Sequence, residues 1–221
     1  MPNQPQKAPL RHIVVLCHPE QDSFNASVAT AYSHAVRAHG HEVVVRDLYA
    51  MGFHPVLRSA ERPGAEGGHF KDVEDELEII RGAEVFVLVY PIWFGSAPAM
   101  LKGYVERVLG SGVTPMEVQG RSAHGALAGK RMLSFTSSGL TEIWLDEQGQ
   151  LKSLVQGFDR YIEHAFSMLP SRHVHFGSIS AGMTLRSVDQ HLEDVRGHAR
   201  DMVRALEEER SAAALAAEVR S

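Results

Sequence analysis

The chain has 221 residues, a formal net charge of −5, 44% apolar residues and 22% charged residues. This length and composition are typical of one α/β domain or two small ones, and the negative charge argues against nonspecific nucleic-acid binding. The sole cysteine, Cys17, excludes an intrachain disulfide and is compatible with a reducing compartment.

The two ends of the chain differ from its middle. Residues 1–9 are polar and proline-rich without an apolar signal core, so we expect a disordered leader and, by default, a cytoplasmic protein. Residues 10–210 contain no linker and are expected to form a single domain, whereas the alanine-rich residues 211–221 are expected to fray. No apolar run approaches the roughly 20 residues of a membrane span, so membrane insertion is not expected.

Short apolar runs alternate with amphipathic segments along the chain. The predicted strands, of the kind buried on both faces, cover residues 12–18, 41–47, 85–90, 131–136 and 174–180. The predicted helices cover residues 23–39, 71–81, 98–110 and 151–168, and a last helix from Ser187, which forms a capping box with Gln190. Five alternations of strand and helix predict a parallel sheet with helices on both faces.

Three predicted loops leave the carboxyl ends of strands, where open parallel sheets bind ligands. In the first, residues 18–25, an imidazole, a hydroxyl and an amide precede a helix N-terminus, which favours phosphate; the alternative is plain helix capping by Ser23 or Asn25. No G-x-G-x-x-G pattern occurs, and residues 125–131 lack the spacing of a nucleotide-hydrolysing loop.

The second loop, residues 90–96, places Trp93 and Phe94 where a hydrophilic turn is expected. Aromatic faces stack on flat conjugated ligands such as a flavin; the alternative is core packing or a subunit contact. The third loop, residues 136–144, begins with small residues whose N–H groups are suited to the flavin N1–C2=O edge; the alternative is a simple turn. Two longer loops, residues 49–70 and 111–129, are expected to be functional or mobile.

Together these segments resemble the flavin-dependent NAD(P)H:quinone reductases, the DT-diaphorase-like group. The resemblance runs from the first predicted strand to the last helix. The motifs that carry it are His18-Pro19 with Ser23-Phe24-Asn25, then Asp47-Leu48-Tyr49-Ala50-Met51-Gly52-Phe53, and then the Trp93 loop with Pro98-Ala99-Met100-Leu101-Lys102-Gly103 and Arg107-Val108-Leu109.

The resemblance implies a flavodoxin-like three-layer sandwich with a five-stranded parallel sheet of order 2-1-3-4-5. It also implies a homodimer with active sites at its interface, in which hydride passes from NAD(P)H through a flavin to a quinone or similar flat acceptor by a ping-pong mechanism. The cofactor is expected to be FAD, with FMN as the alternative, because the phosphate loop contains Asp22 and no cation. A flavodoxin-type electron carrier and a regulatory subunit of an ion-efflux system are the alternative functions.

The resemblance also implies the residues of the site. The expected cofactor-binding residues are His18, Ser23, Phe24, Asn25, Pro91, Ile92, Trp93, Phe94, Thr136, Ser137, Ser138 and Gly139. Four of these, Trp93, Phe94, Ser138 and Gly139, are also expected to be catalytic. No metal is expected, since His173 and His175 share a strand face without an apparent third ligand.

One departure from the family concerns proton transfer. Mammalian members place a tyrosine and then a histidine after the third loop, whereas this chain has Trp144 at the tyrosine's place and no histidine from 143 to 160. Indole donates a hydrogen bond but is no acid or base at neutral pH. Backbone N–H groups or water are therefore expected to stabilise charge in place of a tyrosine–histidine relay.

Overall fold

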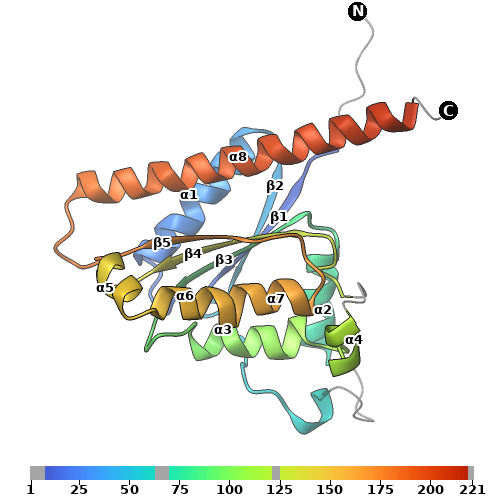
Figure 1. Ribbon diagram of the computed structural model, residues 1–221, viewed down its shortest axis with the longest axis horizontal. Helices are drawn as coiled ribbons and strands as arrows, with labels where there is room; N and C mark the ends of the chain where they lie inside the picture. The colour runs from blue at the N-terminus through green and yellow to red at the C-terminus, as the bar shows by residue number, and fades with distance from the viewer. Residues whose placement is uncertain (1–7, 63–69, 121–124, 219–221) are drawn as a thin grey trace, which may run out of the picture.

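The computed structural model describes residues 8–62, 70–120 and 125–218. Within these residues a parallel five-stranded sheet has the order β2-β1-β3-β4-β5 and is covered by helices on both faces (Figure 1). Its strands are β1 (Arg11–Leu16), β2 (Glu42–Asp47), β3 (Val85–Pro91), β4 (Arg131–Ser137) and β5 (Arg172–Phe176). The predicted fold class and strand order are confirmed.

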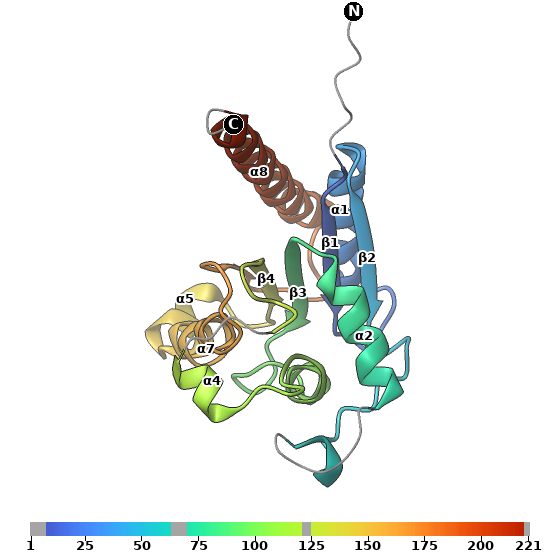
Figure 2. The same ribbon diagram turned by 90° about the vertical axis from the view of Figure 1, so that its right-hand side faces the viewer.

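Two layers of helices flank the sheet (Figures 1 and 2). One layer contains α1 (Phe24–Ala38) and the long α8 (Leu185–Glu218), which pack against each other. The other contains α2 (Lys71–Arg81), α3 (Ala99–Tyr104) with its π-helical continuation η2 (Val105–Leu109), and the sequence of α6 (Gln150–Leu154), η3 (Val155–Asp159) and α7 (Arg160–Ala165). The connecting loops contain the short helices η1 (Ser59–Glu61), α4 (Pro115–Gly120) and α5 (Glu142–Glu147).

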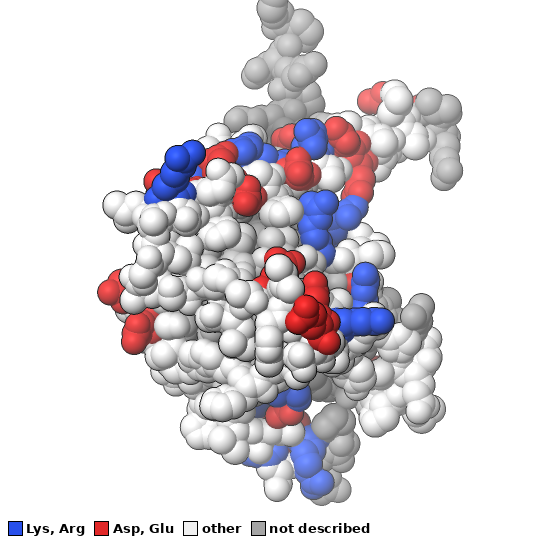
Figure 3. Space-filling view, turned by 60° about the vertical axis from the view of Figure 1, so that its left-hand side comes forward, with Lys and Arg blue, Asp and Glu red and all other residues white. Residues whose placement is uncertain are grey.

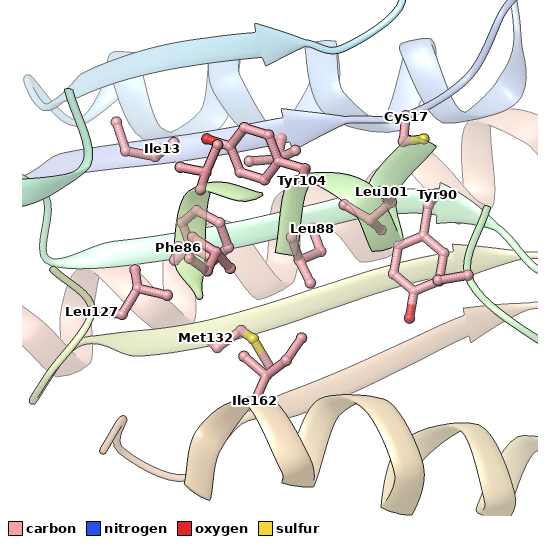
Figure 4. Close-up of a cluster of buried hydrophobic side chains, with 14 of the residues drawn as sticks. Ile13, Cys17, Phe86, Leu88, Tyr90, Leu101, Tyr104, Leu127, Met132 and Ile162 are labelled. Carbon is pink, nitrogen blue, oxygen red and sulfur yellow. The ribbon is translucent and has the colours of Figure 1, made fainter. Parts of the chain in front are cut away.

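The core consists of two apolar clusters, one on each face of the sheet. Alternation along the strands divides the side chains, so that Ile13 of β1 joins the cluster under α2, α3 and α7, while Val14 joins the cluster under α1 and α8. Figure 4 shows the first cluster, where Leu88 of β3, Leu101 of α3 and Ile162 of α7 meet. Every residue of β3 is buried, which explains its continuous apolar sequence.

The ends of the helices differ from the sequence prediction in one cap. Ser23 does cap α1, since its Oγ accepts from the Ala26 N–H at 3.2 Å. The predicted capping box of Ser187 and Gln190 is wrong, because α8 begins at Leu185 and Thr184 Oγ1 accepts from the Ser187 N–H at 3.2 Å. The alanine-rich tail is helical to Glu218, in keeping with the high helix propensity of alanine.

The predicted leader and tail lie partly beyond the described residues. Residues 1–7 and 219–221 fall outside the described ranges, as do residues 63–69 and 121–124 of the two long loops. In the part of the chain that the structure describes, no helix is long and apolar enough to cross a bilayer.

Arg107 clamps the loop after β2 onto the helical layer. This residue belongs to the Arg107-Val108-Leu109 motif of the sequence, and its side chain is fully buried. Its guanidinium donates to Glu61 Oε1 at 2.8 and 2.5 Å, to Asp72 Oδ2 at 2.8 Å and to the His54 carbonyl at 2.6 Å. The π-helical turn η2 is thereby tied to a segment about fifty residues earlier.

A second contact between the same elements involves backbone. Gly103 of α3 faces Pro55, and a Cβ at position 103 would lie 2.2 Å from the Pro55 carbonyl oxygen. Nearby, Glu76 of α2 is buried, and it accepts from Tyr104 Oη at 3.0 Å and from Arg46. The loop after β2 is therefore fixed by charge, hydrogen bonding and close packing.

Removal of the Arg107 cation is expected to destabilise the fold. Glu61 has a side chain that is only 4% exposed, and breaking a buried ion pair by removing one partner costs about 3–5 kcal/mol. We expect Arg107→Met to reduce the free energy of unfolding in urea by about that amount. The matched control is Lys102→Met, which removes an exposed pair with Glu106 and should cost about 0.3–0.5 kcal/mol. Equal losses in the two variants would contradict the clamp.

The buried His12 predicts an acid-sensitive fold. His12 lies fully buried in β1, with Nδ1 2.8 Å from Tyr32 Oη, and burial, together with the charge of His41, lowers its pKa from 6.5 to about 3. Between these pH values the unfolded chain binds the proton and the folded chain does not, so stability falls as pH decreases. From pH 7 to pH 4.5, this residue should account for a loss on the order of 2–3 kcal/mol.

Urea unfolding of the wild type and of His12→Asn at these two pH values checks this expectation. The variant lacks the buried imidazole, so its stability should depend less steeply on pH over this interval. The same slope in both proteins would mean that His12 does not govern the acid sensitivity.

Candidate active site

The carboxyl ends of β1, β3, β4 and β5 bring the predicted loops to one rim. Backbone hydrogen bonds continue past the strands: Cys17 N–H donates to the Val89 carbonyl at 2.9 Å, and Ile92 N–H donates to the Ser137 carbonyl at 2.7 Å. Ser138 N–H donates to the Phe176 carbonyl at 3.0 Å. Each loop therefore starts from a fixed position beside its neighbour.

The second loop presents two aromatic side chains on a tight turn. Trp93 and Ser96 exchange backbone hydrogen bonds at 3.0 and 3.1 Å, and the two residues between them, Phe94 and Gly95, have φ angles of +50° and +78°. A bulky residue in the left-handed region is strained, and such strain concentrates at ligand and catalytic sites. Trp93 is 40% exposed and Phe94 is fully exposed, so the core-packing alternative for this pair is wrong.

The first loop contacts the second through two rings. The His18 imidazole lies 5.9 Å from the Trp93 ring, centroid to centroid, and its Nδ1 accepts from the Glu20 N–H at 3.1 Å. Phe24 packs edge-on against Phe176 at 5.5 Å, which attaches the start of α1 to the end of β5. His18 is thus the member of this loop that reaches the aromatic turn.

Asn25 and Ser137 join the first loop to the third. Asn25 is buried and its Oδ1 accepts from Ser137 Oγ at 3.0 Å. Both side chains, predicted to bind cofactor, are engaged with each other. Pro91 is the last residue of β3 and is buried, and Ile92 beside it is partly buried. These residues hold the loops together beneath the rim.

The third loop is more buried than the sequence indicates. Thr136 is fully buried within β4, and the Ser138 N–H is taken up by the Phe176 carbonyl, so neither matches the expected row of N–H groups facing a ligand. Gly139 is exposed. The part of this loop that offers open backbone therefore begins at Gly139.

A line of buried and partly buried polar side chains lies behind this loop, and its contacts were not predicted from the sequence. Thr136 Oγ1 is 2.8 Å from His173 Nε2 and 2.9 Å from His175 Nδ1, and His173 Nδ1 is 2.5 Å from Asp159 Oδ2. The available signal was the alternation of Ser134, Thr136 and Ser138 along an otherwise apolar strand. No cluster of three or more metal-ligating side chains occurs within residues 8–62, 70–120 and 125–218.

The rim is rich in exposed apolar side chains. Figure 3 brings forward the side of the molecule where α5 lies, and it shows uncharged surface interrupted by acidic and basic side chains. Beyond Trp93 and Phe94, the loop after β4 exposes Leu140, Ile143 and Trp144. Exposed apolar groups gathered at one end of a molecule mark a ligand site or a protein interface.

Two further features limit the chemistry at the rim. Burial raises the pKa of the Cys17 thiol to about 12, so this buried thiol stays protonated at neutral pH and is a poor nucleophile. A groove of about 880 Å³ lies between β5 and α8, but neither Trp93 nor Phe94 lines it. We therefore place the candidate site at the aromatic turn, where exposed rings, backbone strain and the polar line come together.

These features fit a flat conjugated group with a phosphate-bearing tail. Trp93 and Phe94 are free to cover one face of such a group, and Gly139 leaves room for its edge. The N-terminus of the fifteen-residue α1, capped by Ser23, opens beside His18 and is suited to phosphate. The residues present fit a flavin.

The strand order and the rim define a protein of the flavodoxin-like class. The sequence profile of a family described as having the flavodoxin-like fold matches residues 11–202, and the chain belongs to this family. A relative from Haemophilus influenzae, an uncharacterized NAD(P)H oxidoreductase, is 35% identical over 147 residues, which cover 66% of this chain and 72% of that protein. A ribosyldihydronicotinamide dehydrogenase [quinone] from Pongo abelii is 30% identical over 60% of this chain and 65% of its own length, just under two thirds.

Solved structures agree on the fold. An NAD(P)H:quinone oxidoreductase from Methanothermobacter marburgensis superposes with a TM-score of 0.72 at 24% identity, over 88% of this chain and 96% of that one. An FMN-dependent NADH-azoreductase from Bacillus anthracis, solved with FMN, superposes with a TM-score of 0.64 at 16% identity, over 87% of this chain and 99% of that one. At these identities the likeness establishes the shared architecture.

Proposed function

We propose that this chain is a flavin-dependent oxidoreductase that passes hydride from NAD(P)H to quinones or similar flat acceptors. The observation that carries the proposal is the exposed Trp93–Phe94 pair on a strained turn at the rim of the sheet. Membership of a family whose relatives are NAD(P)H oxidoreductases and quinone dehydrogenases supports the reaction class.

Each loop has a distinct task in this proposal. A flavin held by these loops would supply hydride transfer through its N5, with donor and acceptor using the same place in turn in a ping-pong mechanism. Trp93 and Phe94 form the wall on which the ring system lies, and their strained turn holds them in one orientation. The Gly139 backbone borders the pyrimidine edge, and the α1 N-terminus with His18 receives the phosphates.

The cofactor, the assembly and the location are part of the proposal. The loop between β1 and α1 holds Glu20 and Asp22 and no cation, which favours the singly charged phosphates of FAD over the terminal phosphate of FMN. FMN remains the alternative, and mass analysis of the released chromophore distinguishes the two. The exposed rings favour a homodimer in which a second subunit covers them, and a cytoplasmic location remains the expectation.

A flavodoxin-type electron carrier is the main alternative. A carrier binds flavin at the same rim but does not turn over a pyridine nucleotide, whereas the exposed aromatic pair leaves space for a second flat molecule. A regulatory subunit of an ion-efflux system would co-purify with its channel, and a free, active dimer would count against it.

Steady-state turnover distinguishes the enzyme from the carrier. We expect the purified, flavin-loaded protein to oxidise NADPH or NADH with menadione as acceptor, at an initial rate proportional to enzyme concentration. Parallel lines in a double-reciprocal analysis would support the ping-pong order. Flavin binding without measurable nucleotide oxidation would overturn the enzyme and favour the carrier.

The aromatic wall predicts a graded effect of substitution at position 93. Stacking of an aromatic side chain on a flat base is worth about 1–3 kcal/mol, so Trp93→Ala should weaken flavin binding about 10- to 100-fold in a fluorescence titration. Trp93→Phe keeps a ring and should lose much less. The matched control is Leu215→Ala, an exposed apolar residue of α8. Equal affinity of wild type and Trp93→Ala would refute the stacking role.

A further inference from the structure

A line of polar side chains crosses the apolar face of the sheet beneath the third loop. Ser134, Thr136 and Ser138 alternate along β4 and its extension, and the register of the sheet pairs Ser134 with His173 and Thr136 with His175. Asp159, the last residue of η3, reaches this line from the helical layer. Residues from three separate elements therefore meet in one continuous row.

The row is linked by hydrogen-bond distances from end to end. Asp159 Oδ2 lies 2.5 Å from His173 Nδ1, and His173 Nε2 lies 2.8 Å from Thr136 Oγ1. Thr136 Oγ1 lies 2.9 Å from His175 Nδ1, whose Nε2 lies 3.1 Å from Ser138 Oγ. Ser138 Oγ donates to the Leu140 carbonyl at 2.9 Å, which brings the row to the rim beside Gly139.

Burial limits the order of donors and acceptors in this row, in which Thr136 Oγ1 also lies 3.5 Å from the Val174 carbonyl. Asp159 and Thr136 are fully buried, and the His173 side chain is 9% exposed. A buried polar group that lacks a partner costs about 1–3 kcal/mol, so each ring nitrogen and hydroxyl must donate or accept in turn. The Asp159 carboxylate only accepts, which assigns the Nδ1 proton of His173 to the bond between them.

Two arrangements of hydrogens satisfy the row, and they differ by one proton. In the first, His173 is cationic and donates to Thr136, Thr136 donates to His175 Nδ1, and His175 Nε2 donates to Ser138. In the second, His173 is neutral and every one of these hydrogen bonds runs the other way, so the Ser138 hydroxyl turns from the Leu140 carbonyl to His175 Nε2. The same heavy-atom positions therefore accommodate both states, and the His175 tautomer changes between them.

We propose that Asp159, His173, Thr136, His175 and Ser138 form a proton relay that stores one proton on His173 and exchanges it at the Ser138–Gly139 loop. The relay supplies the acid–base function that Trp144 lacks. This inference rests on the proposed function, because a flavin at the rim gives the relay its purpose.

The transfer conserves atoms and charge. On release, the His173 Nε2 proton moves to Thr136 Oγ1, and the Thr136 hydroxyl proton moves to His175 Nδ1. The His175 Nε2 proton moves to Ser138 Oγ, and the original Ser138 hydroxyl proton moves to an acceptor at the rim. Four N–H or O–H bonds break and four form, no electrons change hands, and one positive charge leaves His173.

The groups around the two imidazoles differ, so that His173 stores the proton and His175 transmits it. Burial and the neighbouring His173 lower the pKa of His175 to about 4, against a smaller opposing effect of Asp146 in α5, so His175 is neutral at physiological pH and transmits. His173 has the buried Asp159 carboxylate as its counter-ion. Asp159 also accepts from Ser134 Oγ at 3.2 Å. From β3, the buried Tyr90 faces this carboxylate, and burial with that charge raises the pKa of Tyr90, which keeps it neutral.

The relay makes a prediction that needs no flavin. In ¹⁵N NMR of histidine-labelled, flavin-free wild type, the His175 tautomer should change from Nδ1–H to Nε2–H at the same pH at which His173 gains its proton. Thr136→Val removes the hydroxyl between the rings and should end this coupling, whereas the matched variant Thr136→Ser should keep it. Because the wild-type measurement is decisive alone, a variant that does not fold does not weaken the test. Independent titration of the two rings in wild type would overturn the relay.

A second measurement connects the relay to turnover. With NADPH and menadione, Thr136→Val should lower kcat about 100-fold, the low end of the range for acid–base catalysis, and flatten its pH profile with little change in KM. Thr136→Ser should retain most of the rate. A coupled NMR titration with an unchanged kcat profile in Thr136→Val would overturn the catalytic role. Failure of the wild type to bind flavin would overturn the proposed function instead, and the NMR result is independent of it.

Discussion

The hydrogen bonds on the two edges of β4 are the constraint on which the site depends. At the end of this strand the Ser137 carbonyl accepts from Ile92 on one side, and Ser138 donates to Phe176 on the other. The first bond sets where the aromatic turn begins, and the second holds the polar loop against β5. A slip of one residue would turn Thr136 to the opposite face of the sheet, away from both histidines.

Buried polar side chains are arranged differently on the two faces of the sheet. Under α1 and α8 the buried polar side chains form separate contacts, such as His12 with Tyr32 and Asn25 with Ser137. Under the other helical layer, the row from Asp159 to Ser138 lies beside tightly packed rings such as Tyr90 and Phe158. Close packing fixes the distances between donors and acceptors, and the low polarity around them makes each bond stronger. A rigid apolar setting thus fixes the positions of the donors and acceptors in the buried polar row.

The sequence predicted the sheet and the aromatic turn but not the contacts between distant side chains. Continuous apolar runs such as β3 identify buried strands, and Trp93 and Phe94 are conspicuous where a polar turn is expected. The meeting of Thr136 with His173 depends on strand register, which periodicity does not supply. Arg107 pairs with Glu61, which lies forty-six residues away in the sequence, and no local sequence pattern predicts such a pairing. Whether the predicted residues bind flavin stays a prediction.

The meeting of Gly103 with Pro55 has a consequence for how this sequence can diverge. Backbone touches backbone there, with a Cβ at 103 falling 2.6 Å from the Pro55 Cα, so no choice of rotamer relieves a larger residue. A larger residue at position 103 would require the loop around Pro55, between β2 and η1, to take a different path. The same loop contains Phe53, whose ring packs against Tyr104. A change at position 103 would therefore also disturb the packing of Phe53 against Tyr104.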